Sequence, residues 1–257
     1  MVVPSQALAQ LQEFARRVDR AAPGVLAGLY AVGSVALGDF RPPLSNIDAV
    51  AVAGEPWDAS GLRAVRRAAH GLRCAGQRPR VACVTWADLR SEPCEVEAPG
   101  FVGRAAVPGG DLVNPLTWAV LRTAGVCVRG AEYPELGLGD VRGWAAAHLA
   151  GWWGRWLQHV PLGPLILRRN IAEAVLEVAR LAQVVSSGRI VSKLEAGEAA
   201  EESGPPNQQR VLKDAAGYRR GIRVSMYWGP YERRRHALAY IRSVVEAVGA
   251  APGSLEA

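Results

Sequence analysis

The sequence predicts an α+β fold in which a domain of mixed sheet and helices (residues 1–138) precedes an all-helical domain (residues 139–257). Three observations predict this division. Short apolar runs bounded by glycine and proline, which are typical of buried strands, fall before residue 130. Helical periodicity then dominates from residue 141 to residue 248. Between them, glycines and a proline punctuate residues 130–139, which marks the boundary.

The first domain alternates helix and strand patterns. Leu8, Leu11, Phe14 and Val18 have helical spacing, and residues 58–75 return to the same period. Asn114 is expected to cap a further helix that begins at Pro115, because proline lacks only a donor that the first turn does not use. Strands are predicted where apolar runs lack a helical period, at residues 25–32, 47–52, 81–85 and 126–128.

The sequence of the second domain predicts consecutive helices. The first covers residues 141–159 and carries Trp144, His148, Trp152 and Trp156 at four-residue steps, which favours packing over ligand stacking. Ser192 and Glu195 have the spacing of a capping box and predict a helix start. The other predicted helices lie at residues 171–187, 208–218 and 231–248.

Composition limits the function classes. The chain has 257 residues, is 49% hydrophobic and has a net charge of +6, of which residues 140–257 contribute 16 Lys/Arg against 11 Asp/Glu, or +5. The arginines are dispersed, which favours a solvated surface or a small anionic partner such as a nucleotide and argues against nucleic-acid binding. No apolar run approaches a membrane span, so no membrane partner is expected. Four cysteines without a CxxC pair predict reduced thiols in a cytoplasmic protein.

One stretch combines residues suited to phosphate chemistry. A predicted strand leads into Gly33-Ser34, where glycine permits close approach of a phosphate and the serine hydroxyl can donate to it. After a spacer, Asn46-Ile47-Asp48 opens the next strand, and side chains two residues apart in a strand point the same way. Asn46 and Asp48 are therefore expected to face the Gly33-Ser34 turn together. This layout resembles the nucleotidyltransferase motif of Gly-Ser, a spacer and Asp-x-Asp.

Over nearly its whole length the sequence also resembles the streptomycin–spectinomycin adenylyltransferases. The resemblance is carried by LTWAVLRTAGVCVRGAE, RRNIAEAVLEVARLAQVVSSGRIVSKLEAGEAA and QQRVLKDAAGYRRG. It implies a nucleotidyltransferase-fold first domain, ATP and magnesium bound between the domains, and adenylyl transfer to a hydroxyl of a small molecule. By this resemblance Gly33 and Ser34 hold phosphate and Asp48 with Asn46 holds the metal. Arg180 and Lys193 would then contact the nucleotide and Tyr218 would lie against it.

The sequence departs from that family at its carboxylates. Asn46 replaces the first aspartate of the motif, which weakens the attraction for a divalent metal. Arg80 falls where the family has a catalytic glutamate, or Val81 does if the alignment slips by one residue, and arginine cannot act as a base. Asp88 could replace that glutamate only if the strand is short.

The third departure lies at the positions that face the cationic drug in the family. They fall near Leu167, Arg168 and Asn170, and the chain has no acid between Asp140 and Glu173. A neutral or anionic acceptor is therefore expected rather than a polycationic aminoglycoside.

The departures leave alternatives open. The chain could be a catalytically inactive relative that senses a nucleotide or binds a protein, or a structural protein in which Arg80 is the counter-ion of Asp48. Arg180 and Lys193 could equally be helix-surface charges, and Tyr218 a packing aromatic.

Overall fold

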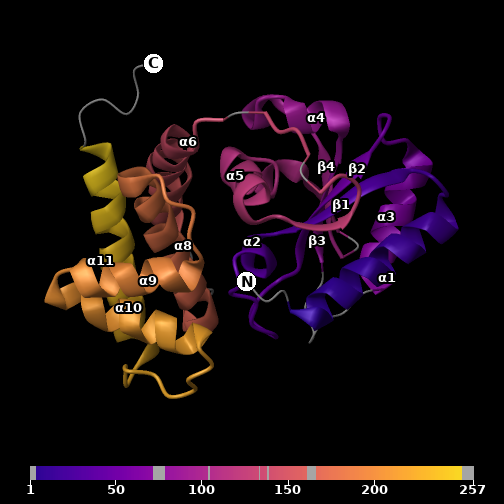
Figure 1. Cartoon of the computed structure of the whole chain (residues 1–257). Helices are drawn as coiled ribbons and strands as arrows, with labels where there is room; N and C mark the ends of the chain where they lie inside the picture. Colours follow the sequence, from indigo (N-terminus) through magenta and orange to yellow (C-terminus); the bar gives the residue numbers. More distant parts are fainter. Residues whose placement is uncertain are drawn as a thin grey trace. The chain divides into compact units, whose positions relative to one another are not determined.

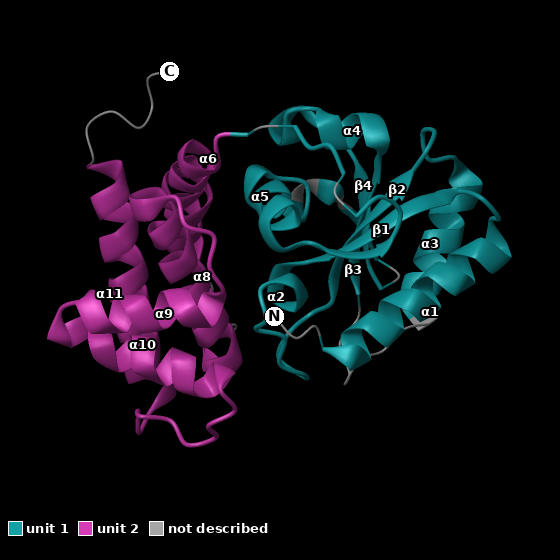
Figure 2. Cartoon of the chain, in the orientation of Figure 1, with its two compact units in different colours: residues 1–139 teal, residues 140–257 magenta. Residues whose placement is uncertain are grey.

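The computed structural model describes residues 4–71, 79–103, 105–132, 134–137, 139–160 and 166–250. The chain divides into two compact units, residues 1–139 and 140–257 (Figure 2). The first unit combines a mixed sheet with helices, and the regular elements described in the second are helices. The predicted fold class is therefore confirmed. Cys74 and the predicted end of the helix at residues 72–75 lie outside the described residues.

A six-stranded sheet organises the first unit, in the order β5-β4-β3-β2-β1-β6. Strands β2 and β3 are parallel, and the other neighbouring pairs are antiparallel. Strands β4 and β5 form a short hairpin that the sequence analysis missed, because proline and glycine surround both four-residue strands and resemble loop signals. The strands are β1 (Leu26–Val32), β2 (Asp48–Ala53), β3 (Arg80–Thr85), β4 (Pro99–Val102), β5 (Ala105–Pro108) and β6 (Val126–Arg129).

Helices cover both faces of this sheet (Figure 1). On one face, α1 (Ser5–Ala21) and α3 (Ala59–Gly71) contact each other and bury their apolar stripes against β1, β2 and β3. Helices α2 (Gly33–Ala36) and α5 (Pro115–Ala124) contact β1 and lie on the opposite face. The core on this face is therefore built from every second strand residue and the 3.6-residue stripe of α1.

The second unit is a helix bundle. The predicted helix over residues 141–159 forms with a π-helical turn inside it, and Trp144, His148 and Trp152 stack along it, with ring centroids 5.0 and 5.6 Å apart. Among the described residues, no helix has the length and apolar character needed to cross a membrane. The helices are α6 (Val141–His148), η3 (Leu149–Trp153), α7 (Gly154–His159), α8 (Arg168–Ser187), α9 (Lys193–Ser203), α10 (Pro206–Arg219) and α11 (Pro230–Gly249).

Leu11 on α1 tests this account of the core of the first unit, because its side chain is fully buried. We expect Leu11→Ala to lower the free energy of unfolding by about 2–5 kcal/mol, through lost burial and the remaining cavity. The exposed neighbour Gln12 supplies the control, and Gln12→Ala is expected to stay within about 0.5 kcal/mol of wild type. Urea unfolding measures both, and equal effects would contradict the assigned helix face.

Candidate functional site

The turn after β1 is held against the start of β2. Gly33 opens α2 with a φ of +59°, a conformation that favours glycine. A Cβ atom built on Gly33 would lie 2.7 Å from Oδ2 of Asp48, so a larger residue would also collide with that carboxylate. The structure thus places the Asp48 carboxylate at the Gly33-Ser34 turn.

Asp48 is paired with Arg80 on the neighbouring strand. The two residues are register partners in the parallel β2–β3 ladder, and the Arg80 amide donates to the Ile47 carbonyl at 2.8 Å. The Arg80 guanidinium then donates from Nε to Asp48 Oδ1 at 2.7 Å and from Nη2 to Oδ2 at 3.0 Å. This is the bidentate geometry in which an arginine–carboxylate pair is strongest. Val81 is in register with Ala49, so Arg80 is the residue beside Asp48.

A magnesium ion does not fit these residues. Mg²⁺ requires near-octahedral oxygen ligands, usually with one or two carboxylates free to bind it. Both Asp48 oxygens accept hydrogen bonds from a cation, and the Asp48 side chain is only 12% exposed. Within the described parts of the chain, no three His, Cys, Asp or Glu residues form a group that could hold a metal. The metal role expected of Asp48 and Asn46 therefore has no geometric support.

The remaining candidates of the first unit lie at different places. Ser34 is half-buried in α2, and Asn46 is half-buried just before β2 begins. The Asp88 carboxylate accepts from the Thr85 amide at 2.7 Å in a capping box at the far end of β3. Thr85 lies five positions after Arg80 along the extended strand, which places their Cα atoms roughly 16 Å apart. Asp88 therefore does not replace the missing base.

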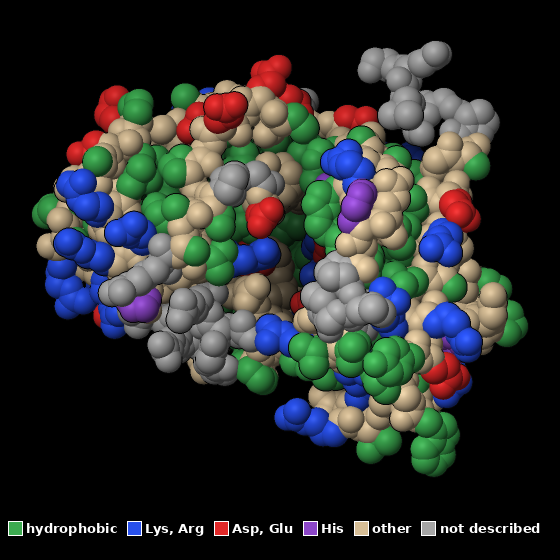
Figure 3. Space-filling view, turned by 180° about the vertical axis from the view of Figure 1, so that it is seen from behind, with side chains coloured by type: hydrophobic (Ala, Val, Ile, Leu, Met, Phe, Trp, Pro, Cys, Tyr) green, Lys and Arg blue, Asp and Glu red, His purple; other side chains and the backbone are tan. Residues whose placement is uncertain are grey.

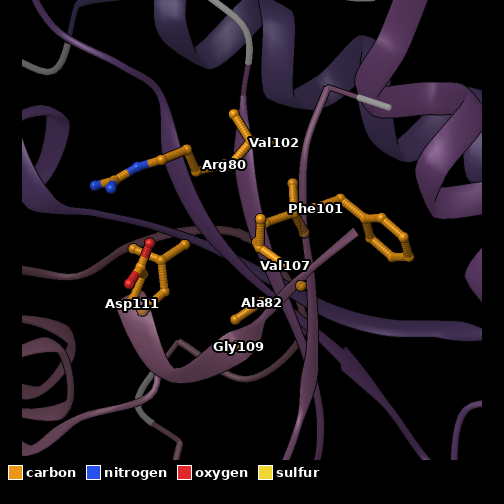
Figure 4. Close-up of a pocket in the computed structure, with 10 residues that line it drawn as sticks. Arg80, Ala82, Phe101, Val102, Val107, Gly109 and Asp111 are labelled. Atoms are coloured by element: carbon orange, nitrogen blue, oxygen red, sulfur yellow. The ribbon is translucent and has the colours of Figure 1, made fainter. Parts of the chain in front are cut away.

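An apolar pocket adjoins Arg80 on the β4–β5 side of the sheet (Figure 4). Backbone and apolar side chains of β3, β4 and β5 form most of its wall, including Phe101 and Val107, and Arg80 and Asp111 are its charged members. In Figure 4 the Arg80 guanidinium points away from Phe101. The pocket therefore adds apolar surface beside the ion pair and supplies no ligand set for phosphate.

A second charged cluster lies in the helical unit. Lys193, the first residue of α9 after the Ser192 cap, places Nζ 2.7 Å from Glu173 Oε2 and 3.1 Å from Glu177 Oε2. Arg180 Nη2 lies 2.6 Å from Glu177 Oε1. Arg219 Nη1 lies 3.9 Å from Glu173 Oε1.

This cluster brings three cations beside two carboxylates. The sequence analysis named Arg180 and Lys193 but missed the other three. Glu173, Glu177 and Arg180 have helical spacing that could have indicated a shared face.

The cluster is electrostatically coupled. Burial alone would raise the pKa of Glu177, but the charges and hydrogen bonds of Arg180 and Lys193 dominate and hold that pKa well below its ordinary value. Burial would lower the pKa of Lys193, whereas Glu177 and Glu173 raise it, and the net pKa is raised. Both groups are therefore held in their charged forms.

Tyr218 lies in a different setting. The Arg168 guanidinium sits 5.3 Å from the centroid of the Tyr218 ring, a cation–π distance. Arg168 is itself fixed by Asp214, at 3.0 Å between Nη2 and Oδ1. Leu167 is exposed. Neither Leu167 nor Arg168 has a carboxylate, although the resemblance leads us to expect acids near these positions.

Comparison with known proteins first concerns the helical unit. Residues 157–247 match the model of the aminoglycoside adenylyltransferase C-terminal domain. The helical unit is therefore similar to the C-terminal domain of that family.

A second comparison concerns the fold of the whole chain. It is similar to the structure of a spectinomycin adenyltransferase from Enterococcus faecialis solved with ATP and spectinomycin, with a TM-score of 0.65 at 15% identity over 93% of this chain and 98% of that one. No curated protein matches the sequence significantly.

The Asp48–Arg80 pair makes a stability prediction. Arg80→Leu leaves Asp48 buried without a counter-charge, and we expect it to lower the free energy of unfolding by about 2–4 kcal/mol. The double variant Arg80→Leu/Asp48→Asn should recover at least half of that loss, because the uncompensated charge is gone. Urea unfolding of wild type, both single variants and the double variant gives the coupling energy. A coupling energy of zero would contradict the bidentate pair.

The lowered pKa of Glu177 predicts that the stability of the protein falls in acid. Because its folded pKa is lowered, its contribution to stability is present above its unfolded pKa, near 4.5, and is lost as pH falls below that value. We expect the thermal midpoint to drop between pH 5 and about pH 3, and Glu177→Gln to flatten this drop. Glu202→Gln, an exposed change on α9, is the control and should keep the wild-type slope. Parallel slopes in all three proteins would count against the coupled cluster.

Proposed function

We propose that this protein binds ATP without magnesium, with the Arg80 guanidinium as the cation next to the phosphates. The bidentate Asp48–Arg80 pair carries this proposal. It places a guanidinium, whose side chain is 31% exposed, beside Asp48 at the Gly33-Ser34 turn, where a phosphate would compete with the carboxylate for that guanidinium. Arginine remains protonated at every physiological pH and matches phosphate oxygens in charge and planar geometry.

Two further groups of the first unit suit a phosphate. Gly33 has no side chain, which allows a ligand to approach the backbone of the turn. The half-exposed Ser34 hydroxyl can donate to a phosphate oxygen. Gly33 and Ser34 would therefore orient the phosphate, and Arg80 would balance part of its charge.

The helical unit carries groups suited to the same ligand. Lys193 and Arg180 belong to a cluster of three cations and two carboxylates and remain partly exposed, at 26% and 16% of their side chains. Their positive charges would attract an added anion. Tyr218 offers an aromatic ring against which a base can lie. The ATP bound in the Enterococcus adenyltransferase structure supports the choice of nucleotide.

Adenylyl transfer to a hydroxyl of a small molecule is the second candidate, and the family match favours it. The acceptor would have to lose its proton without a positioned base, which typically contributes about a hundredfold or more to rate. No acid occurs between Asp140 and Glu173, and Arg168 is fixed by Asp214. A neutral or anionic acceptor therefore suits this chain better than a polycationic aminoglycoside.

Isothermal titration with ATP, in magnesium and in EDTA, tests the proposal. We expect saturable binding whose dissociation constant differs by less than about threefold between the two buffers, because the cation is covalently part of the chain. The double variant Arg80→Met/Asp48→Asn, which leaves no unpaired charge, should bind at least about tenfold more weakly. Arg63→Met, on an exposed position of α3, is the control and should bind like wild type.

Other outcomes separate the candidates. Binding that requires magnesium, together with pyrophosphate release when spectinomycin is added, would replace the proposal with adenylyl transfer. The absence of ATP binding in both buffers would reject a nucleotide site of either kind.

A further inference from the structure

The loop between α10 and α11 exposes large hydrophobic side chains. Trp228 is fully exposed, at 102% of its reference area, and Val224 is 79% exposed. Contiguous apolar exposure of this kind marks a binding surface more often than a chance feature. This loop together with the first two residues of α11, residues 220–231, is called the apolar loop below, and its exposed hydrophobic residues are Ile222, Val224, Met226, Trp228 and Tyr231.

Along the loop the side chains that face solvent are apolar, whereas an ordinary half-buried segment directs its polar side chains to solvent. The even-numbered apolar residues point to solvent. Ser225 and Tyr227 lie between them and turn inward: the Ser225 hydroxyl donates to Asp214 at 3.0 Å, and the Tyr227 hydroxyl lies 3.1 Å from His236 Nδ1. The polar groups thus fasten the loop to the bundle, and the apolar groups remain available.

A buried ion pair sets this conformation. Asp214 is 2% exposed and accepts from Arg168 at 3.0 Å and from the Met226 amide at 2.8 Å. Arg168 also donates to the carbonyls of Ile222 and Arg223, at 2.7 and 3.0 Å. Buried polar groups that are satisfied in this way specify one conformation. The exposed hydrophobic residues are therefore held in place by the fold.

Exposed positive charge lies on and beside the loop. Of the six arginines in residues 219–235, Arg219 and Arg233 are buried and Arg220 pairs with Glu198. Arg223 and Arg235 are exposed, and the one acid of this range, Glu232, is paired with Arg210 at 2.8 Å. Figure 3 shows hydrophobic side chains protruding at the end of the helical unit, with Lys and Arg side chains in the same region.

We propose that the apolar loop docks on an anionic phospholipid surface, with Trp228 and Val224 entering the interface and the arginines facing the headgroups. Tryptophan, aliphatic residues and arginine together are the composition of peripheral membrane anchors. A fully exposed, protruding tryptophan needs no complementary pocket in a lipid interface, whereas a protein partner would have to supply one. The earlier expectation of no membrane partner rested on the lack of a spanning segment, and interfacial docking requires none.

Co-sedimentation of the full-length protein with vesicles tests this. We expect binding to vesicles of 70% phosphatidylcholine and 30% phosphatidylglycerol, weak binding to pure phosphatidylcholine, and loss of binding as salt screens the charges. Trp228→Ala should lower the partition coefficient about tenfold. Arg223→Gln/Arg235→Gln should lower it about fivefold on anionic vesicles.

Matched controls lie in the same unit. Trp152→Ala removes another exposed tryptophan and Arg242→Gln removes an exposed arginine further along α11, and both should bind like wild type. Failure to bind anionic vesicles, or equal partitioning of Trp228→Ala and wild type, would overturn the proposal. So would a self-association in analytical ultracentrifugation that Trp228→Ala abolishes while vesicle binding is absent, since the occupant would then be a second copy of the chain.

Discussion

Asp48 and Arg80 form a bidentate ion pair at the start of two parallel strands. The arrangement of the site at the Gly33-Ser34 turn depends on this pair. The pairing of β2 with β3 fixes the register that brings the two side chains together. The same carboxylate fills the space beside Gly33, so the turn after β1 can be only glycine. Both carboxylate oxygens accept hydrogen bonds from the guanidinium. Strand register thus brings the pair together, and the turn conformation and the engagement of the carboxylate follow from it.

The parts of the fold that depend on local pattern could be predicted from the sequence. The stripe of Leu11, Phe14 and Val18 predicted α1, and unbroken apolar runs predicted β1, β2 and β3. The π-helical turn within residues 141–159 could not be predicted, because the four-residue spacing of its tryptophans fits either kind of turn. The hairpin of β4 and β5 was missed because Gly100 and Gly103 give a short edge hairpin the appearance of a loop.

The residues of the candidate site could be predicted only where the family resemblance covered them or where their spacing within one helix or strand indicated a shared face. Gly33 and Asp48 followed from the motif, and Arg80 from its place on the next strand. The partners of Lys193 were not predicted, because Glu173 lies 20 residues earlier and approaches only when α8 and α9 pack. The apolar loop had no signal at all in the sequence. Its outward side chains depend on Asp214 and Arg168, which are 46 residues apart.

The departures from the resembling family share one physical character. Where the resemblance leads us to expect a carboxylate offered to a ligand, this chain has a guanidinium engaged with its own carboxylate. Arg80 pairs with Asp48 on the neighbouring strand, and Arg168 pairs with Asp214 in the helical unit. In both places a guanidinium and a carboxylate of the chain satisfy each other in fixed geometry. This shared arrangement is the electrostatic basis for proposing a neutral or anionic ligand rather than a cationic one.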